Sequence, residues 1–179
     1  MNQSRTGAAP APDTTPVTLR EGLLYGAMGL PLAFVALPLY VVLPNHYAAA
    51  FGMPLATLGL ILLGARLFDA IIDPWIGRWC DHLFARSPSR VLTMGLFAGV
   101  VLAAGFGLLF FPGTRDPLGL AVWAGASLAL TYTAYSALSV AHQSWGAMLG
   151  GNAQRRSRIV AWREGLALLG VVLASMAPR

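Results

Sequence analysis

Five long apolar runs, separated by short polar segments, set the tightest limit on how this chain folds. An α-helix rises 1.5 Å per residue, so about 20 apolar residues are needed to cross the hydrocarbon core of a bilayer. The runs lie at about residues 19–43, 54–79, 91–111, 118–141 and 159–177. Only 11% of the 179 residues are charged and 56% are hydrophobic. In a soluble domain, by contrast, roughly a quarter of all residues are charged. The sequence therefore predicts an all-α membrane protein with about five transmembrane helices.

The first 18 residues differ from the rest of the chain. They are rich in Pro, Ala and Thr and contain no apolar stretch, so we expect a flexible cytoplasmic tail rather than a signal peptide. The transmembrane bundle would then occupy residues 19–179. Cys80 is the only cysteine, which excludes an intramolecular disulfide and a thiolate metal site.

The arginines predict the orientation of the spans. Those expected on one side of the membrane are Arg5, Arg20, Arg78, Arg86, Arg90, Arg155, Arg156, Arg158 and Arg163, against Arg115 and Arg179 on the other. Because positive charge is retained in the cytoplasm, we expect a multi-pass protein of the cell (inner) membrane with a cytoplasmic N-terminus. The net charge of +5 lies at the ends of apolar runs rather than on a water-exposed face, so no nucleic acid partner is expected.

The number of spans also suggests an interruption. Many transporters are built from inverted structural repeats, and with three helices per repeat five spans make one repeat and two-thirds of the next. We therefore expect at least a sixth helix to be missing, and the C-terminal half of a transporter to be a partner of this chain.

The second run carries a polar stripe. In the segment GARLFDAIIDPWIGRWCD (64–81), Arg66, Asp69, Asp73, Gly77 and Asp81 follow one another at intervals of three or four residues. At about 100° per residue, such spacing places them within roughly a third of the helix circumference. The stripe puts ionisable groups inside a span, where they pair, line a water-filled cavity or do work.

The charges of this stripe do not balance. Arg66 can pair with Asp69 at i, i+3, which leaves Asp73 one positive charge short. Sodium, a proton, or a basic residue of another helix would neutralise it, and Pro74 frees the carbonyl of Ala70 as a further oxygen ligand. The alternative is a structural ion-pair network that holds this helix against its neighbours. For Asp81, beside Arg78, we expect an interfacial salt bridge or a loop gate.

The three histidines and Arg163 lie near predicted span ends. The histidines are His46, His82 and His142, and we expect them to contact water or headgroups rather than to relay protons. Arg163 enters the fifth span, where its side chain either reaches a cavity or extends back to the headgroups.

The segment ARLFDAIIDPWIGRWCD (65–81) resembles the second-helix signature of the glycoside/pentoside/hexuronide:cation symporter family, the melibiose permease relatives within the major facilitator superfamily. Gly77 and Asp81 also resemble the start of that superfamily's GxxxD loop motif. The resemblance extends to TYTAYSALS (131–139) and to RRSRIVAWREGLALLG (155–170).

The resemblance implies roles for particular residues. Asp69 and Asp73 would coordinate the coupling cation, sodium if not a proton, with Thr133 as an auxiliary oxygen. The substrate contacts would be Arg163, Ser136 and Tyr132, and the charge network and gate would be Arg66, Gly77 and Asp81. Two departures stand out, because Pro31 and Ser136 occupy positions where melibiose permease has sugar-binding aspartates.

The sequence thus predicts the N-terminal fragment of a cation-coupled symporter for a sugar, a glycoside or a related small polar solute. It predicts no cofactor besides the coupling ion, and no enzyme, because no nucleophile and base lie at a plausible spacing. Two alternatives stay open: a proton-driven major facilitator exporter, and a truncated, non-transporting membrane partner protein.

Overall fold

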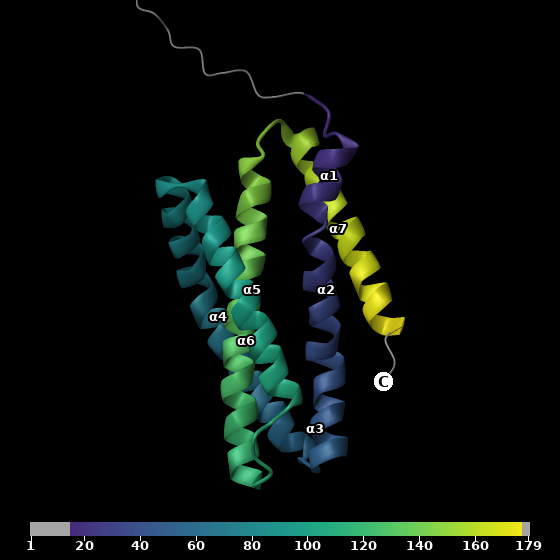
Figure 1. Cartoon of the computed structure of the whole chain (residues 1–179), viewed down its shortest axis with the longest axis vertical. Coiled ribbons are helices and arrows are strands. Elements are labelled where there is room, and N and C mark those ends of the chain that lie inside the picture. The colour runs from purple at the N-terminus through teal and green to yellow at the C-terminus, as the bar shows by residue number, and fades with distance from the viewer. Residues whose placement is uncertain (1–14, 177–179) are drawn as a thin grey trace, which may run out of the picture.

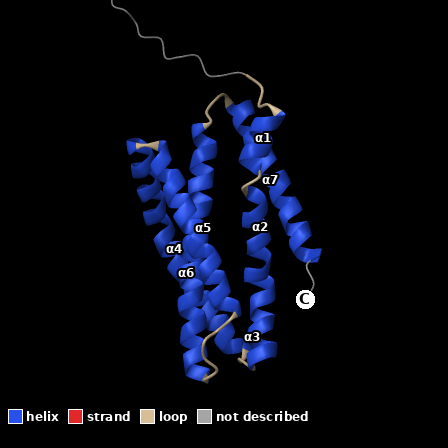
Figure 2. Ribbon diagram, in the orientation of Figure 1, coloured by secondary structure: helices blue, strands red, loops and turns tan. Residues whose placement is uncertain are grey.

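A computed structural model describes residues 15–176 of the chain as helices joined by short turns, with no strand in that range (Figures 1 and 2). Five helices are long and apolar enough to cross a membrane: Leu19–Phe51, Leu55–Arg86, Pro88–Phe110, Pro117–Met148 and Ala153–Met176. The prediction of an all-α bundle with five spans is confirmed. Arg5, Arg179 and most of the expected tail lie outside the described residues.

The first span is a chain of short helical elements. α1 (Leu19–Gly26) and α2 (Gly29–Leu37) are followed by the π-helical turn η1 (Pro38–Val42) and by α3 (Leu43–Phe51). Pro38 opens η1, and proline cannot supply the N–H of a regular i→i−4 bond, so the helix widens there. This local change of register sets the direction of the side chains within η1.

The remaining spans are continuous helices: α4 (Leu55–Arg86), α5 (Pro88–Phe110), α6 (Pro117–Met148) and α7 (Ala153–Met176). α3 ends at Gly52, which adopts a left-handed φ of 66° that favours glycine. α6 begins at Asp116, whose carboxylate accepts a hydrogen bond from the N–H of Gly119 at 2.8 Å. α4 continues beyond the apolar run to Arg86, so its last turns form a polar extension.

The long helices alternate in direction, and their connections gather at two ends of the bundle (Figure 1). The start of α1, the α4–α5 turn and the α6–α7 turn lie at one end, and residues 52–54 and 111–116 lie at the other. All the arginine-rich connections that the structure describes therefore share one end, as the charge pattern predicts. α6 packs along both α4 and α5, whereas α1 and α2 pack against α7.

The largest buried cluster lies toward the arginine-poor end. There the hydroxyl of Tyr47, which is fully buried, donates a hydrogen bond to the carbonyl of Leu109 at 2.8 Å. The cluster joins the end of the first span to α4, α5 and α6, and contains Leu39, Leu43, Tyr47, Met53, Leu58, Ala65, Leu109, Leu120, Ala124, Leu128 and Tyr132. It anchors α4, the helix that carries the charged stripe, against its neighbours.

Glycines bring the first span into close contact with α7. A Cβ added at Gly26 would lie 2.8 Å from the carbonyl oxygen of Trp162, and one added at Gly29 would lie 2.8 Å from that of Arg163. Small residues at these positions let the two backbones approach. By contrast, a Cβ at Gly59 or Gly64 of α4 would meet open space. The packing fixes Arg163 beside the first span.

Candidate functional site

Arg66 of α4 is held by two aromatic rings and one carboxylate. Its guanidinium carbon lies 4.3 Å from the ring centre of Tyr40 and 5.0 Å from that of Tyr132, and its Nη1 lies 3.6 Å from Oδ2 of Asp69. The predicted i, i+3 pair is therefore present. Cations are attracted to the faces of aromatic rings, so Tyr40 and Tyr132 hold Arg66 beside Asp69.

The two tyrosines reach Arg66 from different helices. Tyr40 lies in the π-helical turn η1 and Tyr132 lies on α6, almost fully buried. The resemblance implicates Tyr132, but Tyr40 was not predicted as a site residue. Pro38, two residues earlier, is the one local signal of the altered register, and it does not specify where the tyrosine points.

Asp69 keeps one oxygen without a partner. Oδ2 faces Arg66, while Oδ1 is buried and has no hydrogen-bond partner among the residues that the structure describes. Buried oxygens of this kind are almost always satisfied by a donor, water or an ion. The arrangement therefore has capacity for one more positive or hydrogen-bonding group at Asp69.

Asp73 follows one turn later and faces α6. Its Oδ1 accepts a hydrogen bond from the hydroxyl of Ser136, and no ion pair to Asp73 is present within residues 15–176. The expected charge imbalance at Asp73 is therefore present, but the carboxylate is not unpartnered. Ser136, which the resemblance assigns to the substrate, contacts the carboxylate of Asp73 in this structure.

Thr133 lies on the same helix between these contacts. α4 and α6 run side by side in the same direction (Figure 1), with Arg66 opposite Tyr132 and Asp73 opposite Ser136. Asp69 is therefore at about the level of Thr133. The Thr133 hydroxyl donates to the carbonyl of Ala129 at 2.8 Å, which leaves its oxygen lone pairs available. No contact between Thr133 and either carboxylate occurs within the described range.

The end of the stripe nearest the α4–α5 turn differs from one expectation. Asp81 is exposed and makes no ion pair with Arg78 in the part of the chain described. Arg78 instead donates from Nε to the carbonyl of Pro74 at 3.2 Å and lies 4.5 Å from the ring centre of Trp75. The salt bridge, one of the two roles expected for Asp81, is therefore not formed with Arg78, because the Pro74 carbonyl and the Trp75 indole hold the guanidinium. The other role, a loop gate, stays a prediction. Gly77 is half-buried, and a Cβ added there would meet open space.

A separate polar cavity of about 220 Å³ lies between α2, α6 and α7. It is lined by Gly29, Leu32, Ala33, Tyr135, Ser139, His142, Gln143, Arg163, Glu164 and Ala167. Arg163 thus lines a cavity, one of the two positions expected for its side chain. Its Nη2 and Nε lie 2.6 Å and 3.1 Å from the same oxygen of Glu164. Glu164 was not predicted as a site residue, although a carboxylate inside an apolar run is itself a signal.

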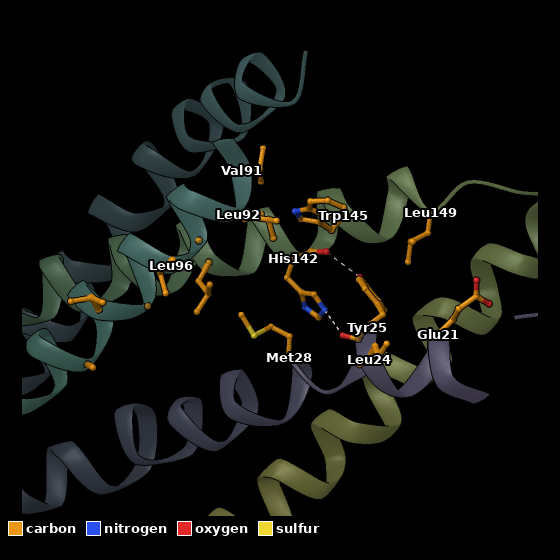
Figure 3. Close-up of a pocket in the computed structure, with 16 residues that line it drawn as sticks. Glu21, Leu24, Tyr25, Met28, Val91, Leu92, Leu96, His142, Trp145 and Leu149 are labelled. Atoms are coloured by element: carbon orange, nitrogen blue, oxygen red, sulfur yellow. Dashed lines mark hydrogen bonds between the residues drawn. The ribbon is translucent and has the colours of Figure 1, made fainter. Parts of the chain in front are cut away.

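His142 is buried, contrary to the expectation that it contacts water or headgroups. Its Nε2 lies 2.9 Å from the carbonyl oxygen of Tyr25, whose hydroxyl donates to the carbonyl of His142 at 3.1 Å (Figure 3). This reciprocal pair ties α6 to the end of α1. It also borders a larger, mostly apolar groove of about 810 Å³ between α1, α5 and α6.

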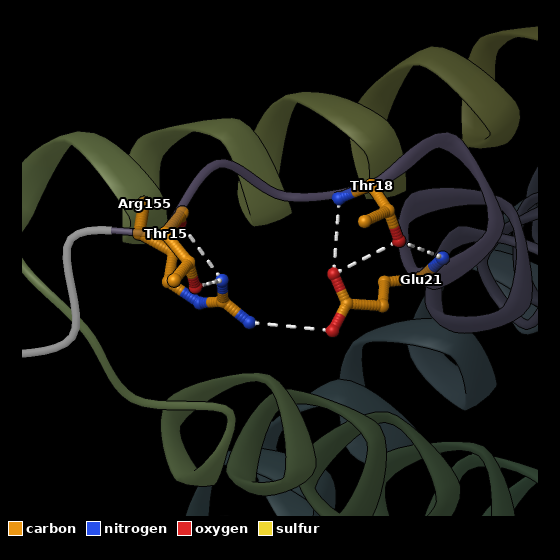
Figure 4. Close-up of polar contacts among 4 residues, drawn as sticks. All are labelled: Thr15, Thr18, Glu21 and Arg155. Carbon is orange, nitrogen blue, oxygen red and sulfur yellow. Dashed lines mark hydrogen bonds and ion pairs between the residues drawn. The ribbon is translucent and has the colours of Figure 1, made fainter.

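A polar clamp joins the starts of α1 and α7. Arg155, which is 9% exposed, donates to the carbonyl and hydroxyl of Thr15 at 2.9 Å and 2.8 Å and lies 3.4 Å from a carboxylate oxygen of Glu21 (Figure 4). The other oxygen of Glu21 accepts from Thr18 in the cap of α1. The clamp fixes the ends of the two helices whose glycine-lined contact positions Arg163.

A five-span helical bundle with paired carboxylates inside one span defines a multi-pass membrane protein of the transporter class. The chain belongs to the MFS/sugar transport protein family, whose description its sequence matches over residues 24–179. This confirms the family resemblance carried by the second span. No solved structure matches the chain.

Two curated relatives are similar over most of the chain. One is named "Uncharacterized symporter YjmB", from Bacillus subtilis, and is 27% identical over 164 residues. The other is named "Putative glycoside/cation symporter YagG", from Escherichia coli, and is 23% identical over 161 residues. Each alignment covers 90% of this chain and 35% of the relative, so the chain spans about a third of the length of these relatives.

Proposed function

We propose that this chain forms the cation-binding part of a symporter for a sugar or a related small polar solute. The observation that carries the proposal is the buried, unpartnered Oδ1 of Asp69, one helical turn from the carboxylate of Asp73. Two carboxylates and a single arginine, which pairs with Asp69, leave one negative charge to be neutralised. A bound cation supplies that charge inside the membrane at the lowest cost.

The donor set suits a small hard cation. Sodium prefers oxygen ligands, as other hard cations do, and the neighbourhood offers carboxylate oxygens of Asp69 and Asp73 and the hydroxyl oxygen of Thr133. A proton would neutralise the same charge by binding one carboxylate. The coupling ion is therefore sodium or a proton, and the site is the same for either.

α6 provides a route for coupling the cation to the solute. Ser136 contacts Asp73, and Tyr135 and Ser139, its neighbours on the helix, line the polar cavity that Arg163 enters. A displacement of α6 would change both places at once. Coupling then follows if the cation and the solute both bind more tightly to the same position of α6.

The wider setting of the proposal follows the relatives. The shared end of the arginine-rich connections would face the cytoplasm of the cell (inner) membrane. A second half, provided by the rest of a full-length transporter, would close the solute path against the exposed side of α4. The curated relatives named as symporters, almost three times as long, support this arrangement.

Uptake by the full-length gene product tests the function. Cells expressing it would be given labelled monosaccharides and glycosides, with and without an inward sodium or proton gradient. We expect one gradient to drive accumulation of at least one solute, and Asp69→Asn to abolish it while the capping variant Asp116→Asn does not. Accumulation that is unchanged in Asp69→Asn would contradict the proposed cation site.

A further inference from the structure

We propose that Glu164 sets the charge selectivity of the polar cavity between α2, α6 and α7, so that it accepts uncharged, hydroxyl-rich solutes and disfavours sugar acids. The inference rests on the proposed transport function only for the identity of the solute. Its electrostatic basis is a property of this chain alone. The electrostatic effect and the choice of solute can therefore be tested separately.

The geometry of the Arg163–Glu164 pair determines how much of the arginine's charge the cavity presents. Both Nε and Nη2 of Arg163 donate to one oxygen of Glu164, at 3.1 Å and 2.6 Å. The Glu164 side chain is 59% exposed, so the contact contributes little stability, but it places opposite charges next to each other. The positive charge that Arg163 brings to the cavity is therefore compensated at contact distance by its own chain neighbour.

The rest of the cavity wall carries little charge. The other polar side chains that line the cavity are Tyr135, Ser139, His142 and Gln143. The ring of His142 lies against the carbonyl of Tyr25 at 2.9 Å, and Gln143 donates to Ser139 at 3.1 Å. With Arg163 and Glu164 paired, the lining is close to neutral, and its polar part consists of hydroxyl, amide and aromatic groups beside the aliphatic Leu32, Ala33 and Ala167.

A wall of this kind interacts differently with neutral and with anionic solutes. A guanidinium has five N–H donors. Glu164 accepts from Nε and Nη2, so Arg163 keeps other N–H groups for solute oxygens. Glu164 keeps its second oxygen as an acceptor for solute hydroxyls. A sugar hydroxyl both donates and accepts and so matches this pair. A sugar carboxylate only accepts, and it meets the negative charge of Glu164 beside the arginine that would otherwise bind it.

The size of the cavity agrees with a small solute. Its volume of about 220 Å³ is below the roughly 300–1,000 Å³ of pockets for drug-sized ligands. The part of the site that this chain provides therefore fits a single sugar ring. A larger glycoside would have to extend beyond these walls.

The electrostatic test uses a cysteine inside the cavity. Ser139→Cys would be introduced together with Cys80→Ala, and the chain would be held in lipid nanodiscs. The rates of modification by an anionic and a cationic methanethiosulfonate reagent of similar size would then be compared. We expect Glu164→Gln to raise the ratio of anionic to cationic rates by about tenfold, because it leaves Arg163 uncompensated at close range.

Two variants control this measurement. The double change Arg163→Gln and Glu164→Gln removes both charges and should return the ratio to within about twofold of the parent. Asp116→Asn removes a carboxylate far from the cavity and should leave the ratio unchanged. If Glu164→Gln alone leaves the ratio unchanged, the inference is overturned, whatever the protein transports.

The selectivity test uses the full-length gene product. Uptake of a labelled uncharged sugar would be challenged with unlabelled D-glucose, D-xylose, D-glucuronate and D-galacturonate. We expect the parent to be inhibited by at least one uncharged sugar and at least tenfold less by the acids, and Glu164→Gln to narrow that difference. Stronger inhibition of the parent by the acids would contradict the inference without contradicting sugar transport. A failure of every solute to be taken up would contradict the proposed function and leave the labelling result to decide the inference.

Discussion

The hydroxyl of Ser136 on α6 donates a hydrogen bond to the carboxylate of Asp73 on α4. This contact joins the helix that carries the acidic stripe to the helix whose next turn lines the polar cavity. A cation bound at Asp73, as we propose, would be connected directly to α6 through this contact. The contact therefore connects the two halves of the proposed mechanism.

Removal of this hydroxyl should alter the cation site. A hydrogen bond to a charged group contributes about 1.5–3 kcal/mol and favours the ionised carboxylate, so we expect Ser136→Ala to shift the cation concentration for half-maximal uptake by at least about tenfold. The shift is toward lower concentration if the ion is a proton, because protonation of Asp73 then no longer breaks the bond, and toward higher concentration if it is sodium, because the carboxylate is no longer held in place. Ser144→Ala is the control, since Ser144 lies on the same helix and faces Cys80 instead. Equal cation dependence in both variants would exclude a role for Ser136 at Asp73.

Tyr40 should matter through its ring. Tyr40→Phe keeps an aromatic face against Arg66, whereas Tyr40→Leu removes it and frees the guanidinium to approach Asp73. A cation–π contact contributes about 0.5–2 kcal/mol, so we expect a shift of about threefold or more in cation affinity for the leucine variant only. The measurement is the sodium and proton dependence of uptake in each variant. A phenylalanine variant as impaired as the leucine variant would contradict the cation–π interpretation.

The glycine contact between the first span and α7 predicts an effect on stability. A methyl group at Gly29 would lie 2.8 Å from the carbonyl oxygen of Arg163, and such overpacking typically costs about 1–3 kcal/mol. We therefore expect Gly29→Ala to lower the thermal unfolding temperature in detergent. Gly59→Ala on α4 meets no atom within 4 Å and should be neutral or slightly stabilising, since alanine favours helix. The reverse order of the two variants would refute this packing.

Much of the fold and part of the site could be predicted from the sequence. Features that depend on residues close together in the chain could be predicted, and those that depend on contacts between separate helices could not. The five helices and the Arg66–Asp69 pair depend on local hydropathy and on i, i+3 spacing, which the sequence contains directly. The contact of Arg66 with Tyr40 could not be predicted, because a π-helical turn rotates every later side chain in the first span. The Ser136–Asp73 bond and the burial of His142 depend on how separate helices align, which periodicity does not determine.

Thiol labelling tests the arrangement of the helix ends. With Cys80 replaced by Ala, single cysteines at Ser87 and Asn152 should react with a membrane-impermeant reagent from one side only, and a cysteine at Arg115 from the other. Ser87 and Asn152 belong to the connections at the arginine-rich end, and Arg115 lies between α5 and α6 at the opposite end (Figure 1). Labelling of all three positions from one side would contradict the five-span bundle.

The measurement that tests the central claim most directly is solute affinity as a function of sodium concentration and pH, in the full-length gene product and in its Asp73→Asn variant. Asparagine keeps the size of the side chain and can still accept from Ser136, but it carries no charge. We predict that affinity in the parent rises with sodium or with proton concentration, and that the variant binds solute with an affinity that neither changes. Parental ion dependence retained in Asp73→Asn would show that the carboxylate belongs to a structural network and that the cation binds elsewhere.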